Sequence, residues 1–251
     1  MKFLRIICKG TFNSFRQPDF HTYHKTLSLP PKTTVGGMIG SALGVSPREI
    51  NENWLVNGRF MLGIVGFNNG QANDLWQIRK YESKQIKAFQ TGKDCAPYKT
   101  AVIVRELLYQ SHFTLYLSFV NESDYELLEN AFENPKWALS LGREDELVKI
   151  ISLQKIDIQP VIEELSYKNT VLPFDITTIS YRPDLNALSS CNILKSAPKV
   201  VSIPTSFTIE NDSEIRSGND YHRFTYVYTL PILVNAEGYF DEEYNHAFQI
   251  F

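Results

Sequence analysis

Residues 21–25, with the sequence HTYHK, bring together side chains that can transfer protons or bind an anion. Imidazole, phenol and ammonium groups suit general acid–base cleavage of RNA, and they also bind phosphate without cleaving it. The candidate catalytic residues are His21, Tyr23, His24 and Lys25. His21 and His24 could also bind a metal, but Asp19 is the one carboxylate near them in sequence, and no metal site is expected. A polar surface loop is the simpler interpretation of the segment.

A second candidate for anion binding is the start of a helix within residues 28–44, SLPPKTTVGGMIGSALG. The two prolines favour an extended backbone before the helix, and Thr33 or Thr34 could cap its first turn. The apolar residues then recur at helical spacing, and Gly44 stands where a C-terminal cap belongs. Free N–H groups at the helix N-terminus, beside Lys32 and the two threonines, would suit a phosphate.

Three glycines inside this predicted helix each cost about 1 kcal/mol relative to alanine. Gly36, Gly37 and Gly40 lie off the apolar stripe, where the missing side chains let another backbone approach closely. RNA or a neighbouring part of the protein could fill that space, and both alternatives stay open. The stretch is not a Walker loop, because the pattern GxxxxGK[ST] is absent.

A long polar segment at residues 68–110 combines basic and aromatic side chains, a pattern typical of single-stranded RNA binding. Its far end is strand-like, so we expect an extended β-hairpin arm; ordinary sheet aromatics are the alternative explanation. The aromatic residues of the arm are Trp76, Tyr81, Phe89 and Tyr98. The basic residues expected to hold an RNA backbone are Arg79, Lys80, Lys84, Lys87 and Lys93.

The net charge of −3 conceals two halves of opposite sign. Residues 1–110 hold 15 Lys and Arg against 7 Asp and Glu, whereas residues 111–251 hold 10 against 21. A basic half suits a polyanion, and an acidic half suits solvent or a basic protein partner.

The rest of the hydrophobic pattern predicts strands and helices around the arm. Strands are expected at 3–8, 59–67, 112–120 and 151–158, with a second helix at 124–132 after a capping box of Ser123 and Glu126. Without the arm the order is βαββαβ, as in ferredoxin-like and RNA-recognition folds. We predict an α+β fold: a ferredoxin-like domain at 1–160 with an arm inserted at 68–110, and a mostly antiparallel, β-rich subdomain at 161–251.

The three cysteines are far apart and match no metal-binding spacing. Cys8, Cys95 and Cys191 are therefore expected to be free thiols in a cytoplasmic protein without a cofactor. No apolar run approaches the roughly 20 residues that a membrane span needs.

Several short motifs occur together in one order: TFNSFRQP, PPKTT, GGMIGSALG, VRELL and SLGREDE. Their combination over roughly residues 1–150 resembles the Cas-five family. Members are CRISPR-associated RAMP subunits at the 5′ end of the guide RNA in type I Cascade complexes. The resemblance implies a ferredoxin-like RAMP domain, a β-hairpin thumb corresponding to the arm, and binding to the 5′ handle of CRISPR RNA. It also implies contacts with the Cas-seven backbone subunit and the large, Cas-eight type subunit, and with target DNA only through the complex.

The match looks closest to the type I-B or related branch, which implies a subunit that does not cut RNA. In the type I-C branch the family member is an endoribonuclease that uses Tyr, Lys and His, the residue types found at 21–25. Under the resemblance, the residues expected to contact the handle are Arg16, Lys25, Lys32, Thr33, Thr34, Gly36 and Gly37. The basic residues of the arm would clamp the guide. Arg143 either contacts RNA or forms an ion pair within its own turn.

Overall fold

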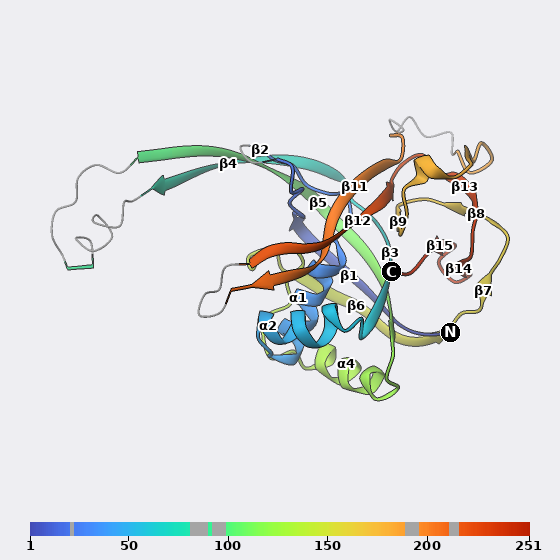
Figure 1. The fold of residues 1–251 in the computed structure, drawn as a ribbon, viewed down its shortest axis with the longest axis horizontal. Coiled ribbons are helices and arrows are strands. Elements are labelled where there is room, and N and C mark those ends of the chain that lie inside the picture. Colours follow the sequence, from blue (N-terminus) through green and yellow to red (C-terminus); the bar gives the residue numbers. More distant parts are fainter. Residues whose placement is uncertain (21–22, 81–89, 92–98, 189–195, 211–215) are drawn as a thin grey trace.

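The computed structural model describes residues 1–20, 23–80, 90–91, 99–188, 196–210 and 216–251 (Figure 1). The helical elements are α1 Lys32–Leu43, α2 Pro47–Ile50, the π-helical turn η1 Asn51–Val56, α4 Ser123–Glu133 and the 3-10 turn η2 Ile176–Thr178. The first strands are β1 Lys2–Asn13, β2 Tyr23–His24, β3 Phe60–Phe67, β4 Gly70–Lys80, β5 Lys99–Phe119, β6 Val148–Asp157, β7 Pro160–Val161 and β8 Glu164–Tyr167. The remaining strands are β9 Thr170–Leu172, β10 Tyr181–Pro183, β11 Lys199–Ile209, β12 Arg216–Val227, β13 Ile232–Asn235, β14 Gly238–Asp241 and β15 His246–Phe248.

A large sheet forms the body of the protein, with the path β11-β12-β9-β3-β5-β1-β6 and with β2 and β4 paired to β5. Every pairing along that path is antiparallel. In chain order α1 connects β1 to β3 and α4 connects β5 to β6, so both long helices cover the same face of the sheet (Figure 1). The predicted succession of strand, helix, strand, arm, strand, helix and strand is confirmed.

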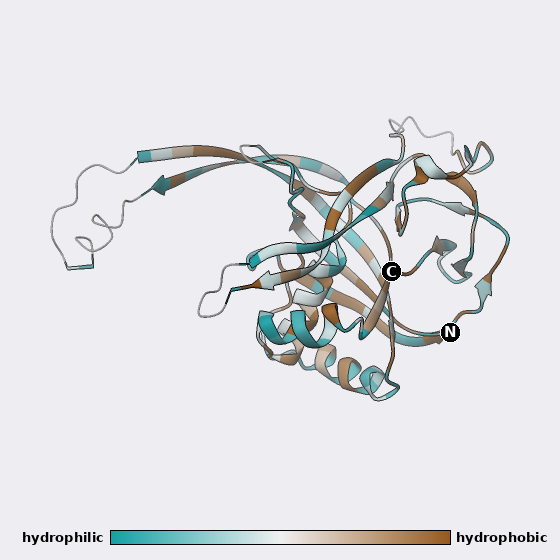
Figure 2. Cartoon of the chain, in the orientation of Figure 1, coloured by the Kyte–Doolittle hydropathy of each residue, from teal (hydrophilic) through white to brown (hydrophobic). Residues whose placement is uncertain are grey.

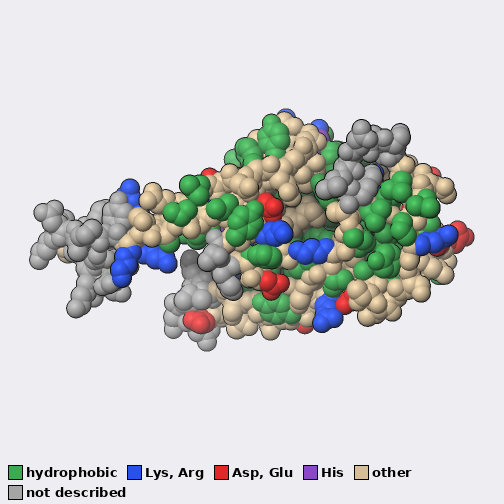
Figure 3. Space-filling model, turned by 90° about the horizontal axis from the view of Figure 1, so that it is seen from above, with side chains coloured by type: hydrophobic (Ala, Val, Ile, Leu, Met, Phe, Trp, Pro, Cys, Tyr) green, Lys and Arg blue, Asp and Glu red, His purple; other side chains and the backbone are tan. Residues whose placement is uncertain are grey.

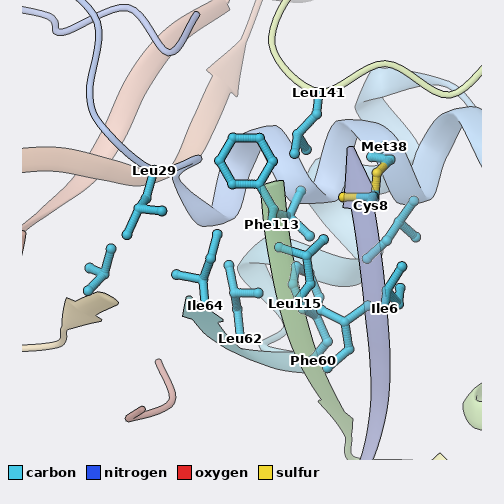
Figure 4. Packing of buried hydrophobic residues seen from close by; sticks show 14 of the residues in the cluster. Ile6, Cys8, Leu29, Met38, Phe60, Leu62, Ile64, Phe113, Leu115 and Leu141 are labelled. Carbon is cyan, nitrogen blue, oxygen red and sulfur yellow. The ribbon is translucent and has the colours of Figure 1, made fainter. Parts of the chain in front are cut away.

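The main hydrophobic core lies between the sheet and these helices. Side chains alternate across a strand, so Ile6 and Cys8 of β1 and Phe113 and Leu115 of β5 all point toward α1, where Met38 meets them (Figure 4). Cys8 is a buried free thiol, and burial raises its pKa to about 12. The other two cysteines lie outside the described residues.

Both predicted N-terminal caps are wrong, because each helix begins one or more residues earlier than expected. Helix α1 has Pro31 at its N-cap with no side-chain hydrogen bond, so Thr33 and Thr34 lie inside its first turn. Helix α4 already includes Ser123, which therefore cannot cap it. A complete capping box does occur at Ser46, before the short helix α2. The left-handed C-cap at Gly44, with φ 72°, is as predicted.

Two of the glycines of α1 are explained by packing within the protein. A Cβ on Gly36 would lie 3.2 Å from Leu55, and one on Gly40 would lie 2.8 Å from Ile50. The segment α2–η1 therefore fills the space that the missing side chains leave. A Cβ on Gly37 would meet nothing within 4 Å, so that position stays open.

The arm is a long antiparallel hairpin of β4 and β5 that projects from the body (Figure 1). Its pairing runs from Gly70 opposite Tyr109 to Lys80 opposite Lys99. Hydrophilic and hydrophobic residues intermix along it (Figure 2). The end of the hairpin lies outside the described residues.

The C-terminal part is β-rich and antiparallel, yet it is continuous with the N-terminal sheet. Strand β9 pairs with β3, and β12 and β11 follow it in the same sheet. Two small sheets, β10-β13-β8 and β15-β14-β7, surround a second core that includes Tyr167, Val227 and Ile232. No helix among the described residues is long and apolar enough to cross a membrane.

Candidate nucleic-acid interface

Cationic and aromatic side chains meet where the arm leaves the body; we call this group the arm-root cluster. It consists of Arg16, His24, Trp76, Arg105 and Arg143. The guanidinium carbons of Arg105 and Arg143 lie 4.4 and 4.8 Å from the centre of the Trp76 ring, within cation–π range. Trp76 is 43% exposed, so its ring remains accessible from solvent.

The arm itself positions Arg105 and Trp76. Asp74 and Arg105 are directly opposite each other on β4 and β5, and the Arg105 guanidinium donates to the Asp74 carboxylate. Trp76 follows Asp74 by two residues and so projects from the same face. Arg105 was not among the site residues expected from the sequence. Its position opposite Asp74 depends on how β4 and β5 pair, and that pairing orients its guanidinium.

The SLGREDE motif folds into a tight loop that holds Arg143 in the cluster. Glu146 is buried, and its carboxylate accepts hydrogen bonds from the backbone N–H groups of Ser14 and Arg143 and from the Ser14 hydroxyl. Gly142 has φ 122°, a conformation that favours glycine, and a Cβ there would lie 2.7 Å from the Ser14 carbonyl oxygen. The loop is therefore locked to the end of β1.

Arg143 lies among charged side chains of both signs. Burial lowers the pKa of the Arg143 guanidinium. The charges of Arg105 and Arg16 lower it further, whereas those of Glu146 and Asp145 in its own turn raise it. No salt bridge to Arg16 or Arg143 occurs within the part of the chain that the structure describes. Arg143 instead lies 3.4 Å from Nδ1 of His24. Among the described residues Arg143 therefore has an aromatic ring and an imidazole as side-chain partners, and both roles considered for it stay predictions.

The three candidate catalytic residues that the structure describes, Tyr23, His24 and Lys25, do not converge. His24 pairs with Arg105 and shares its face of the hairpin, whereas Tyr23 pairs with Val104 and donates to Asn73 on the opposite face. Tyr23 and His24 therefore cannot reach one phosphate together. The ammonium of Lys25 lies over the ring of Phe20, 5.5 Å from its centre. His21 lies outside the described residues.

The first turn of α1 does not present the cation that the sequence suggested. Lys32 points inward: its ammonium donates to the backbone oxygen of Phe251 at 2.9 Å and lies over the Phe60 ring. Thr33 and Thr34 are half-buried, Gly36 is covered, and Gly37 is exposed. The Lys32 side chain thus ties α1 to the chain around residue 251 and does not project into solvent as the sequence suggested.

The inward orientation of Lys32 gives a prediction about pH. Burial lowers its pKa from an ordinary 10.5 to about 8, so the unfolded chain binds more protons than the folded one between these values. Stability from this group must then rise with pH across that window, and below pH 8 the cost of the buried charge is fully present. We expect the free energy of unfolding of wild type, minus that of Lys32→Met, to grow by about 1–3 kcal/mol from pH 7 to pH 10. Urea denaturation at each pH measures this; a constant difference would contradict it.

The arm carries further cations toward its outer end. Arg79 and Lys80 are exposed on β4, opposite Thr100 and Lys99. Seen from above, basic side chains lie along this part of the arm (Figure 3). The other arm residues expected to bind RNA, Lys84, Lys87 and Lys93, lie outside the described residues. Among the described residues no group of three or more His, Cys, Asp or Glu is arranged to hold a metal ion.

Comparison with known proteins identifies the family. A family model described as CRISPR-associated protein (Cas_Cas5) matches residues 3–231. A solved structure described as a CRISPR RNA-guided surveillance complex aligns with a TM-score of 0.52 at 16% identity, covering 94% of this chain and 90% of that one. A CRISPR protein from Archaeoglobus fulgidus aligns with a TM-score of 0.51 at 15% identity, covering 100% and 99%. No curated protein matches the sequence. Because the family model spans most of the chain, this protein belongs to the CRISPR-associated Cas-five family.

Proposed function

We propose that the protein is a non-catalytic subunit of a type I Cascade complex in CRISPR defence. Its arm-root cluster binds the 5′ handle of the CRISPR RNA in the cytoplasm. The β-hairpin arm serves as the thumb, clamping the guide backbone with Arg79 and Lys80 and with the lysines nearer its end. The strand order β3-β5-β1-β6 supports assignment of the body as a ferredoxin-like RAMP domain.

The observation that carries the proposal is the exposed Trp76 ring beside two guanidinium groups, with Arg16 nearby. A guanidinium group can donate two parallel hydrogen bonds to the oxygens of one phosphate, and a tryptophan ring can stack on an unpaired base. The side chain of Arg105 is held by Asp74 before any ligand arrives, so less conformational entropy is lost on binding. The arrangement suits single-stranded RNA.

The expected protein partners are the Cas-seven backbone subunit and the large, Cas-eight type subunit, with target DNA reached through the complex. The family membership supports this, as does a solved structure of similar fold described as a surveillance complex. The acidic second half of the chain would face basic surfaces of these neighbours or solvent.

The endoribonuclease alternative requires a base and an acid at one phosphate. Tyr23 and His24 project from opposite faces of the arm, which argues against that pairing. Incubating the purified protein with labelled repeat RNA in EDTA tests the alternative. We expect intact RNA; specific cleavage upstream of the handle that disappears in His24→Ala would establish the enzyme.

Removal of one guanidinium tests the binding proposal. Arg143→Gln should weaken binding of a synthetic handle RNA about tenfold, because a charge-assisted contact contributes roughly 1.5 kcal/mol. It should also reduce the slope of log affinity against log salt by about 0.7. Fluorescence anisotropy at several salt concentrations measures both.

The matched control is Arg182→Gln. Arg182 is an exposed arginine of β10 whose guanidinium is paired with Glu164, away from the arm. It should bind handle RNA like wild type. Equal affinities for wild type and Arg143→Gln, with both proteins folded by circular dichroism, would reject the arm-root cluster as the RNA site.

A further inference from the structure

The sheet face opposite α1 and α4 is only partly covered. At one end of β1 and β5, the C-terminal strands β14 and β15 close it: Phe248 stacks on Tyr116 with ring centres 3.8 Å apart, and Tyr239 packs edge-on against Phe3. Toward the arm this cover stops. The residues there that project from the helix-free face include Lys9 and His112, which are opposite each other on β1 and β5.

Two adjoining hollows of about 430 and 450 Å³ lie over this uncovered half. They share His112, and together we call them the sheet-face groove. One wall of the 430 Å³ hollow is the turn before β15, and another is the turn between β8 and β9. The residues that line the groove include Lys9, Phe67, His112, Lys149, Lys168 and Asn169.

An aromatic pair lies at the centre of the sheet-face groove. The rings of Phe67 and His112 are stacked, with centres 4.7 Å apart and planes 15° apart. Phe67 remains 46% exposed although the imidazole covers part of its ring. Burial lowers the pKa of the His112 imidazole, and the charge of Lys9 lowers it further, so both effects disfavour the charged ring. The pair therefore offers a flat aromatic surface to a ligand rather than a second cation.

The charges around the groove have one sign. Three exposed lysines line it, and none of its described lining residues is Asp or Glu, in a protein whose net charge is −3. Lys9 and Lys149 are directly opposite each other on neighbouring strands, and like charges in that position destabilise a sheet. An anion between them would remove the repulsion. The amide of Asn169, a residue with φ 54°, adds hydrogen-bonding groups at the rim.

We propose that the sheet-face groove binds an unpaired nucleotide of a single-stranded nucleic acid. The base stacks on the Phe67–His112 pair, and the flanking phosphates lie near Lys9, Lys149 and Lys168. Base stacking on an exposed sheet aromatic, together with lysine contacts to the backbone, is a general physical basis for single-strand binding. The groove is a second nucleic-acid surface, separate from the arm-root cluster. Lysine is depleted at protein–protein interfaces, which favours the nucleotide over a protein occupant.

Photocrosslinking locates the nucleic acid without relying on the arm-root cluster. The full chain in its Arg143→Gln form is irradiated with ten-residue oligouridylate containing 4-thiouridine. In a parallel experiment it is irradiated with the matching deoxy-oligonucleotide containing 4-thiothymidine. Mass spectrometry then identifies the modified peptides. We expect adducts within residues 60–70 or 110–120 from at least one of the two oligonucleotides. The oligonucleotide that reacts shows whether ribose or deoxyribose is accepted. Absence of such adducts with both oligonucleotides overturns the proposal.

Affinity measurements give an independent readout in the wild-type background. Phe67→Leu keeps the apolar volume but removes the aromatic face, so it should weaken binding of the reactive oligonucleotide at least about fivefold. Lys9→Ala with Lys149→Ala should lower the salt slope by about 1.4. Tyr181→Leu, an exposed aromatic of β10 that is 43% exposed, is the matched control and should bind like wild type. Binding by a folded Phe67→Leu within twofold of wild type overturns the proposal.

Discussion

Replacing Arg5 with methionine is expected to lower the free energy of unfolding by about 3–5 kcal/mol. Arg5 is 2% exposed on β1, and its guanidinium donates to Asp241 at 2.9 Å, to Glu243 at 2.5 Å and to Gln154. Asp241 is itself 4% exposed. Methionine fills much of the volume but leaves a buried carboxylate without its cation, and that charge cannot reach water in the folded state. Urea denaturation at pH 7 measures the loss.

A double-mutant cycle and a surface control test whether the unpaired buried carboxylate causes the loss of stability. Asp241→Asn combined with Arg5→Met should recover a large part of the loss, because the buried carboxylate is then gone and Glu243, whose side chain is 58% exposed, is solvated by water. Arg182→Met breaks an ion pair with Glu164 in which the two side chains are 67% and 39% exposed, so it should cost at most about 1 kcal/mol. An Arg5→Met protein as stable as wild type would show that the carboxylates are satisfied without the guanidinium.

Replacing Gly142 with alanine is expected to cost about 2–4 kcal/mol and to weaken handle RNA binding together with it. The residue has φ 122°, and a new Cβ would lie 2.7 Å from the Ser14 carbonyl oxygen and in direct conflict with the Glu146 carboxylate. The loop must move, which breaks the hydrogen bonds of a buried carboxylate and displaces Arg143 from Trp76. Chemical denaturation and fluorescence anisotropy, at a temperature where the variant is folded, measure the two effects.

Gly70→Ala is the matched control for this glycine. A Cβ at Gly70 would meet nothing within 4 Å, so stability should change by less than about 0.5 kcal/mol and RNA affinity should not change. If Gly142→Ala loses stability but binds handle RNA like wild type, the loop is structural and does not position Arg143 for RNA.

Both buried polar networks tie distant parts of the sequence to the sheet. The Arg5 network holds the segment around residues 241–243 against β1, and the Glu146 network holds the loop before β6 against the end of β1. The first network fixes the cover over one half of the helix-free face, which sets where the sheet-face groove begins. The second fixes one side of the arm-root cluster.

Patterns along the chain were enough to predict the order of elements. Strands and helices around residues 3–67 and 112–158 follow from alternation and helical spacing, since each has one buried face. The arm was predictable because its pattern of polar, basic and aromatic residues matches no interior strand. The helix starts were not, because α1 and α4 begin without the side-chain caps that the sequence offers.

Of the candidate site, the sequence identified Arg16, Arg143 and the aromatic residue Trp76, but not that they meet. Arg105 joins them only because β4 and β5 pair in a register that places Asp74 opposite it. The same packing removes other candidates. Lys32 turns inward to the Phe251 carbonyl, and α2–η1 covers Gly36.

The sequence by itself determined which segments form strands and helices, where an arm is inserted, and that the first half of the chain is basic. Those properties depend on neighbouring residues and on composition, so they can be judged one segment at a time. Only the tertiary structure decided which cations face solvent and which are buried, and which side chains from distant segments share a face. That outcome depends on strand register and on long-range packing, where a shift of one residue turns every side chain to the other side of the sheet.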